Sequence, residues 1–413
     1  MNTLEIVSIL VGTAALFGWI SSRLLKLPIT IGTMLLTVGA SLIVANVARF
    51  VPGVHNWTAI FAGHIHFESL ILHGLLPLLL FAGAFLLNPE ELTREKLPVA
   101  LLAAPGTVIC FLAVAGLMKL LAGPDISWTE CLIFGAVISP TDPIAVLEML
   151  RRVGVPKAVQ SQLAGESLFN DGLGAVLFLT MIEIARGHSP TFWNVAGLLL
   201  LQAGGAIVLG IAAAWLISML MCRVDSYQVD ILLTITLSLA AYALADAGRL
   251  SAPLEAVVAG IALRHFNRQK PKGLIADERV DEFWTLIDEL LNSILFVLLG
   301  LEILAVSFNL QTVRAGASAV FSVNVVRLAV VAACVGVVHL VRKGRHRSVF
   351  TMTWGGLRGG LSIALALSVP AALGGAWIFG ATYITVVFSI LIQGGSLHYA
   401  LTRRHRKRRH AAV

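Results

Sequence analysis

Long runs of apolar residues, separated by short charged segments or by segments rich in proline and glycine, recur along the whole chain. A helix that crosses the roughly 30 Å hydrocarbon core of a bilayer needs about 20 such residues. The runs do not alternate between apolar and polar positions, as the strands of a transmembrane barrel would. The pattern therefore predicts an all-α polytopic membrane protein with about thirteen transmembrane helices. These fall at residues 4–22, 28–48, 67–87, 97–121, 129–150, 158–185, 192–221, 228–247, 252–264, 283–307, 315–341, 349–370 and 374–401.

The composition supports this interpretation. Apolar residues make up 57% of the 413 residues, and charged residues only 13%. So little polar surface cannot cover a water-soluble globule of this length, which excludes large soluble domains. The formal net charge of +7 does not indicate a nucleic-acid partner, because orientation in the bilayer accounts for an excess of basic residues.

The basic residues are distributed unevenly between the two sides of the predicted helices. Most of the 30 lysines and arginines fall in alternate connections and in the C-terminal tail, residues 402–413. The opposite connections hold only Arg49, Lys119, Arg186, Arg249 and Arg314. Because cytoplasmic loops carry the excess of Lys and Arg, we expect a cytoplasmic C-terminus and an external N-terminus. We expect the basic tail to anchor this topology and to touch anionic lipid.

The fifth predicted span contains a carboxylate between two prolines, in the segment Ser139-Pro140-Thr141-Asp142-Pro143. A charged residue at membrane depth costs a few kcal/mol, so it is retained only where it faces a partner or an aqueous cavity. Pro140 and Pro143 lack backbone donors and disfavour helical geometry before them, so we expect the helix to break here. Freed carbonyls can then bind a cation, and Asp142 can cap the positive end of the following half-helix. The alternative is a simple proline kink.

The sixth predicted span carries four polar residues within two turns. Ser167 and Asp171 are four residues apart and share one face, while Glu166 and Asn170 share the neighbouring face. In a partly desolvated pocket, Asp171 can alternate between binding a proton and binding a metal cation. For Glu166 and Asn170, a structural polar network between helices is an equally good interpretation.

Arg358, in the twelfth predicted span, stands among four glycines in Gly355-Gly356-Leu357-Arg358-Gly359-Gly360. Glycines let helices approach closely and weaken the helix locally. A buried arginine needs a carboxylate, for which Glu166 is our first choice and Asp142 the second. The fifth and twelfth spans are seven apart, as expected if spans one to six and eight to thirteen form two inverted repeats whose broken helices cross.

The three motifs together, with the segments at residues 81–92 and 283–302, resemble the monovalent cation/proton antiporters of the NhaP and NHE type. The resemblance covers most of the chain. It implies that Thr141, Ser167 and Asp171 are ligands of the monovalent cation and that Asp142 serves the crossing helices. It also implies a structural ion pair between Glu166 and Arg358, with Asn170 beside it.

The resemblance also implies an architecture. The family works as a homodimer in which a core bundle moves against a dimerisation scaffold. We expect the core at residues 67–185 and 283–401, and the scaffold with its linkers at residues 1–66 and 192–282. The family topology, with the N-terminus outside, agrees with the one derived from the basic residues.

Two residues depart from the family pattern or are ambiguous in it. Glu255 stands where a small apolar residue is usual, and it either lines the cavity or reaches water. Arg327, in the eleventh span, resembles a family arginine, but a structural role near the headgroups is equally compatible with the sequence. The long cytoplasmic tail of animal relatives is not found, so we expect the inner membrane of a prokaryote.

The predicted function is exchange of a monovalent cation, Na⁺ or Li⁺, for H⁺ by alternating access, with electroneutral one-for-one stoichiometry. K⁺/H⁺ exchange by the same mechanism is the main alternative, since ligand type does not separate the two ions. A cation channel is a further one. An intramembrane hydrolase is disfavoured, because no Ser-His pair or catalytic Asp pair is found. We therefore expect no enzyme activity and no cofactor, and we expect cations, protons and lipid as partners.

Overall fold

The computed structural model describes residues 3–48, 67–121, 126–153, 157–187, 192–268, 274–306, 309–341 and 349–397, and a few single residues between these ranges. Within these ranges, every regular element is a helix. Helices are expected where long apolar segments must satisfy all their backbone hydrogen bonds without water. The basic tail at residues 402–413 lies outside the described residues.

The first half of the chain forms helices up to the long α11. Several of them contain short π-helical turns, as at residues 21–25, 70–75 and 102–106. The α-helices are α1 (Thr3–Ile20), α2 (Ile29–Ala48), α4 (Phe67–Ser69), α5 (Leu76–Phe85), α6 (Pro89–Arg94), α7 (Lys96–Leu101), α8 (Thr107–Leu121), α9 (Trp128–Ile138), α10 (Ile144–Val153) and α11 (Lys157–Ala185).

The second half begins with the long α12 and ends in α20, which continues into a π-helical segment at residues 388–394. Its α-helices are α12 (Phe192–Met221), α13 (Tyr227–Thr236), α14 (Tyr242–Ala247), α15 (Ala252–Arg268), α16 (Leu274–Leu301), α17 (Leu310–Val341), α18 (Val349–Trp354), α19 (Gly360–Leu367) and α20 (Gly375–Val387). A 3-10 turn, Glu302–Ala305, follows α16.

Nine helices of the described residues are long and apolar enough to cross a membrane. They match nine of the predicted spans: Leu4–Leu25, Ile29–Ala48, Phe67–Phe85, Lys96–Leu121, Lys157–Ala185, Trp193–Met221, Tyr227–Ala247, Leu310–Leu340 and Gly375–Leu397. The other four predicted spans fall on the short α15, on α16 with its charged first turns, and on two interrupted helices, α9–α10 and α18–α19. The multi-pass helical architecture is thus confirmed, and the count of thirteen stays a prediction.

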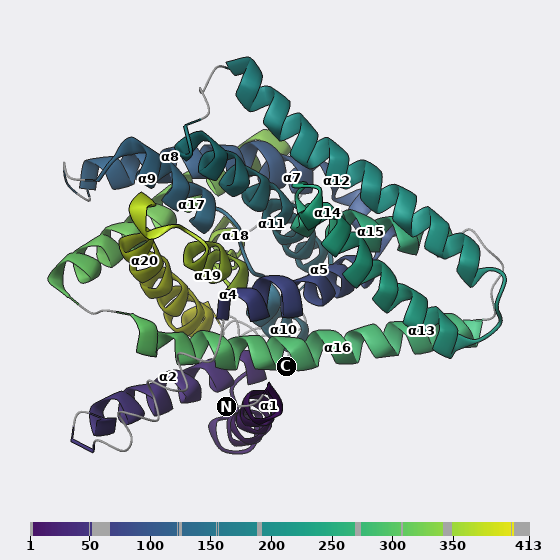
Figure 1. Cartoon of the computed structure of the whole chain (residues 1–413), viewed down its shortest axis with the longest axis horizontal. Helices are drawn as coiled ribbons and strands as arrows, with labels where there is room; N and C mark the ends of the chain where they lie inside the picture. The colour runs from purple at the N-terminus through teal and green to yellow at the C-terminus, as the bar shows by residue number, and fades with distance from the viewer. Residues whose placement is uncertain are drawn as a thin grey trace, which may run out of the picture.

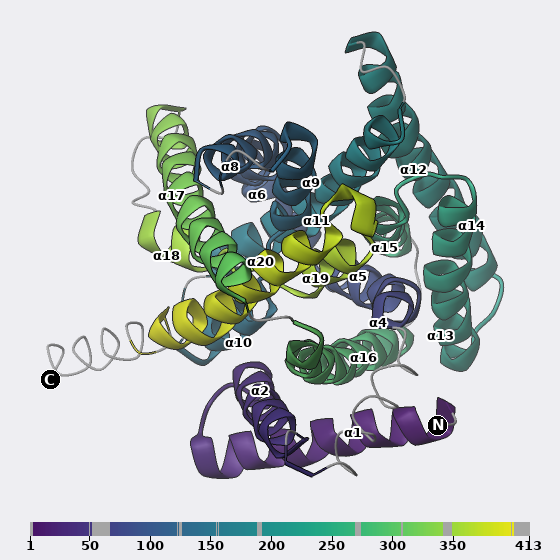
Figure 2. The same cartoon turned by 60° about the vertical axis from the view of Figure 1, so that its left-hand side comes forward.

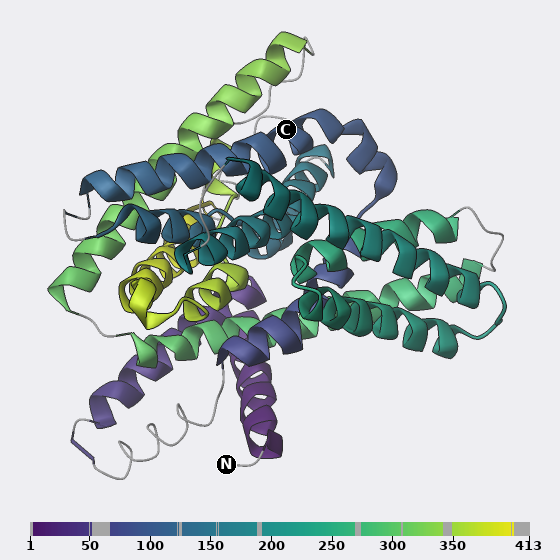
Figure 3. The same ribbon diagram turned by 45° about the horizontal axis from the view of Figure 1, so that its top comes forward.

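Helix α16 lies between the pair formed by α1 and α2 and the rest of the helices. In Figures 1 and 2, α16 passes across the molecule, with α1 and α2 on one side and the other helices on the opposite side. At one end, α15 packs against α12 and α5. At the other end, α8 packs against α9 and α17, and α17 against α20, as Figure 3 shows from above. Although we expected α5 in the core bundle, it packs on α15 and α16; the division into core and scaffold stays a prediction.

Candidate functional site

The predicted break in the fifth span is present. Helix α9 ends at Ile138, and α10 begins at Ile144 after the extended, proline-containing segment. The backbone N–H of Ile144 donates to Asp142 Oδ1 over 2.9 Å, so Asp142 caps α10 as expected. This cap places a negative charge at the positive end of a helix dipole.

A second break lies in the twelfth span, between α18 and α19, and the two breaks meet. The N–H of Asp142 donates to the carbonyl of Leu357 over 2.7 Å, in an isolated antiparallel bridge. A Cβ added to Gly359 would lie 2.2 Å from Asp142 Oδ2, so only glycine allows this approach. The predicted crossing of two broken helices is confirmed.

Helix α11 supplies the side chains that hold the first break in place. Asn170 accepts a hydrogen bond from the N–H of Thr141 over 3.1 Å, and its Nδ2 donates to Thr141 Oγ1 over 2.7 Å. Thr141 Oγ1 also lies 2.9 Å from Ser167 Oγ. All three residues are buried. Asn170 therefore fixes both the backbone and the hydroxyl of Thr141, and the hydroxyls of Thr141 and Ser167 lie together.

A cavity of about 160 Å³ adjoins this network. It is lined by the four residues predicted to bind the cation or proton: Thr141, Asp142, Ser167 and Asp171. No backbone or side-chain group among the described residues hydrogen-bonds the half-buried carboxylate of Asp171. Hydroxyl and carboxylate oxygens are hard ligands, which suit alkali cations and protons rather than soft transition metals.

Arg358 does not have the partner that we expected. Its Nη1 donates to the carbonyls of Ser139 and Pro140, over 2.7 and 2.8 Å. Its own N–H donates to Ser389 Oγ over 2.9 Å. The predicted ion pair with Glu166 is therefore wrong, because the carbonyls freed at the break supply the acceptors that the buried guanidinium needs. Two of the carbonyls freed at the break are therefore engaged by Arg358, and the expectation that freed carbonyls bind the cation stays a prediction.

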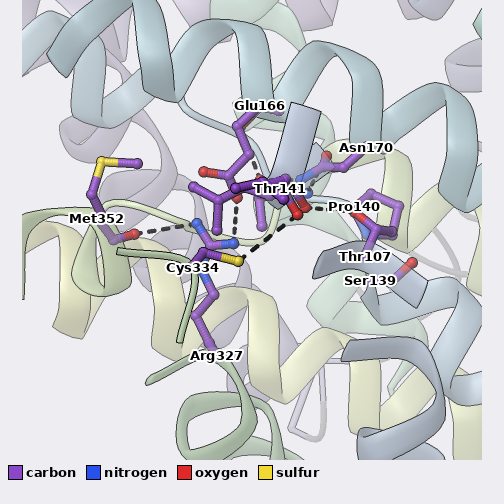
Figure 4. Close-up of polar contacts among 12 residues, drawn as sticks. Thr107, Ser139, Pro140, Thr141, Glu166, Asn170, Arg327, Cys334 and Met352 are labelled. Carbon is purple, nitrogen blue, oxygen red and sulfur yellow. Dashed lines mark hydrogen bonds and ion pairs between the residues drawn. The ribbon is translucent and has the colours of Figure 1, made fainter. Parts of the chain in front are cut away.

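Glu166 is paired with Arg327 instead. The Nη1 of Arg327, on α17, donates to Glu166 Oε1 in a close ion pair, and both side chains are buried. The Nη2 of Arg327 donates to the carbonyl of Met352 over 3.2 Å. Figure 4 shows the guanidinium extended between these two acceptors. Arg327 is thus buried and ties α17 to α11 and α18.

Two further carboxylates, Asp288 and Glu255, have positions that the sequence does not predict. Asp288, on α16, lines the same cavity as Asp171, although the sequence marked residues 283–302 only as a family segment. Glu255, on α15, is fully buried and lies outside the lining of the cavity, so it neither faces the cavity nor reaches water. Both of its carboxyl oxygens are buried without a hydrogen-bond partner among the described residues.

Glu255→Met is expected to raise the free energy of unfolding by about 1–2 kcal/mol, because it removes a buried polar group that has no partner and keeps a similar volume. Thermal melting of the purified protein in detergent measures this. Glu289→Met is the control, since Glu289 is exposed on α16 and its replacement should change stability by less than about 0.5 kcal/mol. A lower melting temperature for Glu255→Met would contradict the expectation.

Comparison with known proteins covers nearly the whole chain. Residues 11–403 match the model of a family described as "Sodium/hydrogen exchanger, transmembrane". The Na⁺/H⁺ antiporter NhaP of Pseudomonas aeruginosa is 36% identical over 403 residues, which are 95% of each chain. The Na⁺/H⁺ antiporter NhaG of Bacillus atrophaeus is 30% identical over 82% of this chain and 64% of its own length.

A solved structure has the same fold. The sodium proton antiporter MjNhaP1 of Methanocaldococcus jannaschii, at pH 8, superimposes with a TM-score of 0.74. The match covers 97% of this chain and 99% of the other. The sequences are only 19% identical, so this likeness concerns the arrangement of the helices.

Proposed function

Because the chain belongs to the sodium/hydrogen exchanger family, we propose that it exchanges Na⁺ for H⁺ across the membrane by alternating access. The observation that carries this is the carboxylate of Asp171, which faces a cavity beside the hydroxyls of Thr141 and Ser167 and has no hydrogen-bond partner among the described residues. The names of the relatives favour Na⁺ over K⁺ as the cation.

The proposed cycle uses one carboxylate for both ions. Asp171 binds Na⁺ with the help of Thr141 and Ser167, or it binds a proton, and the two compete. Two neighbouring charges are engaged elsewhere: Glu166 pairs with Arg327, and Asp142 Oδ1 accepts the N–H of Ile144 at the start of α10. Competition at one site couples the two fluxes, because the site carries either Na⁺ or a proton across the membrane but never both at once.

The cavity extends along α5 from its first residue to the end that precedes a basic connection. Its α5 lining runs from Leu76 to Leu86, about 15 Å at 1.5 Å per residue. On α10, Leu147 also lines it, four residues before Arg151. Basic connections favour the cytoplasmic side. We therefore assign the cavity to the cytoplasmic half of the protein, with the C-terminus inside and the N-terminus outside.

The proposal is tested directly in proteoliposomes. An imposed Na⁺ gradient is expected to move protons, measured with a pH-sensitive dye trapped inside, whereas an equal K⁺ gradient is expected to move far fewer. A channel would carry Na⁺ without moving protons. Equal responses to Na⁺ and K⁺ would contradict Na⁺ as the preferred substrate.

Exchange is expected to be one Na⁺ for one H⁺, because one carboxylate cycles and its charged neighbours stay engaged. One net charge moved across 100 mV is worth about 2.3 kcal/mol, so an electrogenic exchanger would respond strongly to voltage. This exchanger should respond only to the two ion gradients, about 1.4 kcal/mol per pH unit. Proteoliposomes clamped with potassium and valinomycin measure the equilibrium. A shift with voltage would indicate a second titrating group, with Asp142, Glu255 or Glu166 as the first candidates.

The assembly and location are part of the proposal. We propose a homodimer in the inner membrane of a prokaryote, in keeping with the family architecture that the sequence resembles. Helices α1 and α12 bury only a small part of their apolar windows within the fold, which leaves their surfaces to lipid or to a second copy. The mass of the purified protein, corrected for bound detergent, distinguishes a dimer from a monomer.

A further inference from the structure

The cavity has two walls of different character. One wall is polar and comes from the first break and α11, with Thr141, Asp142, Ser167 and Asp171. The opposite wall, from α5 and α16, is apolar except for one carboxylate, Asp288. An ionisable residue in an otherwise apolar wall is costly to retain unless it faces a partner or an aqueous cavity.

The position of Asp288 along α16 places it away from the deep end of the cavity. Leu295, seven residues later on the same face, lies at the level of Gly360, where an added Cβ would meet the leucine side chain at 2.8 Å. Two turns of helix separate Asp288 from this level by about 10 Å. Asp288 lies on the side where α16 begins, seven residues after Asp281, which pairs with Arg264. It is therefore nearer to the cytoplasmic mouth than Leu295 is.

The carboxylate of Asp288 is oriented by a buried amide. Asn292 is 2% exposed, and its Nδ2 donates to Asp288 Oδ1 over 3.1 Å. The Oδ1 of Asn292 is buried without a partner among the described residues. A hydrogen bond from an amide limits the rotation of a carboxylate. The half-buried carboxylate of Asp288 is thus held in one orientation on the cavity wall.

We propose that Asp288 is a transient binding residue for the cation, which it receives at the cytoplasmic mouth and passes to Asp171. The inference rests on the proposed Na⁺/H⁺ exchange and adds a second carboxylate to the cation path. A fixed negative charge in a low-dielectric cleft concentrates cations there. Asp288 lies on α16, across the cavity from the helix that carries Asp171, so it acts on cation capture and not on the proton–cation competition at Asp171.

Asp288→Asn is expected to raise the KM for Na⁺ about 3- to 10-fold at low ionic strength, with kcat unchanged. The rise should occur only at the cytoplasmic face. Everted vesicles present this face outward, and proteoliposomes with the opposite orientation serve as the comparison. The rise should shrink at high ionic strength, adjusted with an impermeant salt, because salt screens the charge. If Asp288 had only a structural role, its replacement would not raise the KM at one face alone, and the change would not depend on ionic strength.

Glu289→Gln is the matched control, because Glu289 is the next residue, is exposed and does not line the cavity. Its KM should stay within about twofold of the unmodified protein. Asp288→Glu keeps the charge and should keep the KM of the unmodified protein at the cytoplasmic face. It serves as the second variant if Asp288→Asn folds poorly. An unchanged KM for Asp288→Asn, an equal rise at both faces, or equal defects in Asp288→Glu and Asp288→Asn would overturn the inference. Failure of the unmodified protein to exchange Na⁺ for H⁺ would instead overturn the proposed function.

Discussion

Asp171→Asn is expected to abolish Na⁺-dependent proton movement and to leave the fold stable. Asparagine has the same shape, but it cannot carry the negative charge that balances Na⁺ or the proton that returns. Losing a charge partner of this kind costs at least about 3 kcal/mol, on the order of 100-fold in affinity. The carboxylate has no hydrogen-bond partner among the described residues, so the change leaves no hydrogen-bond donor unpaired.

Proton movement in proteoliposomes measures the loss of exchange, and thermal melting of the same preparation measures the stability of the fold. Glu183→Gln is the control, since Glu183 lies on the same helix, outside the cavity lining, in a pair with the exposed Arg186. It should transport normally. Proton movement at the rate of the unmodified protein in Asp171→Asn would show that the exchanging carboxylate lies elsewhere.

Arg327→Ala is expected to destabilise the protein by about 3–5 kcal/mol, because it leaves the buried carboxylate of Glu166 without its partner. Transport should be lost with stability, since α11 carries both Glu166 and Asp171. The double replacement by apolar residues, Glu166→Met with Arg327→Met, should recover much of the loss because no buried charge is stranded. Thermal melting in detergent measures the series.

The control for this series is Arg186→Ala, which breaks an exposed pair with Glu183. It should cost less than about 1 kcal/mol. Arg358→Ala provides a contrast, because Arg358 donates to carbonyls and its removal strands no carboxylate. If Arg327→Ala melts at the same temperature as the unmodified protein, the pair with Glu166 does not stabilise the fold.

The residues around the cavity could be predicted from the sequence because their signals are local. Two prolines around Asp142 predict a break, and the four-residue spacing of Ser167 and Asp171 places both on one helix face. The glycines beside Arg358 likewise indicate a close approach of two chain segments. These features need no knowledge of how distant helices pack.

The partners of the buried charges could not be predicted, because they depend on that packing. Arg327 and Arg358 both lie within predicted spans, and either could balance Glu166 on sequence grounds. The packing of α17 beside α8 and against α18 places Arg327 next to Glu166. The carbonyls at the break accept the hydrogen bonds of Arg358 instead. The place of Asp288 in the cavity lining could not be predicted for a similar reason, since the several carboxylates along α16 give no sign of which one faces the cavity.

The hydrogen bonds of Arg358 to the carbonyls of Ser139 and Pro140 bear on ion selectivity. These two carbonyls are the dipoles that would otherwise replace the hydration shell of a cation at the break. With both engaged, we expect an ion beside Asp171 to be coordinated mainly by side-chain oxygens and by the water molecules that it brings. We therefore expect discrimination between Li⁺, Na⁺ and K⁺ to follow the cost of partial dehydration more than the fit to a rigid cage.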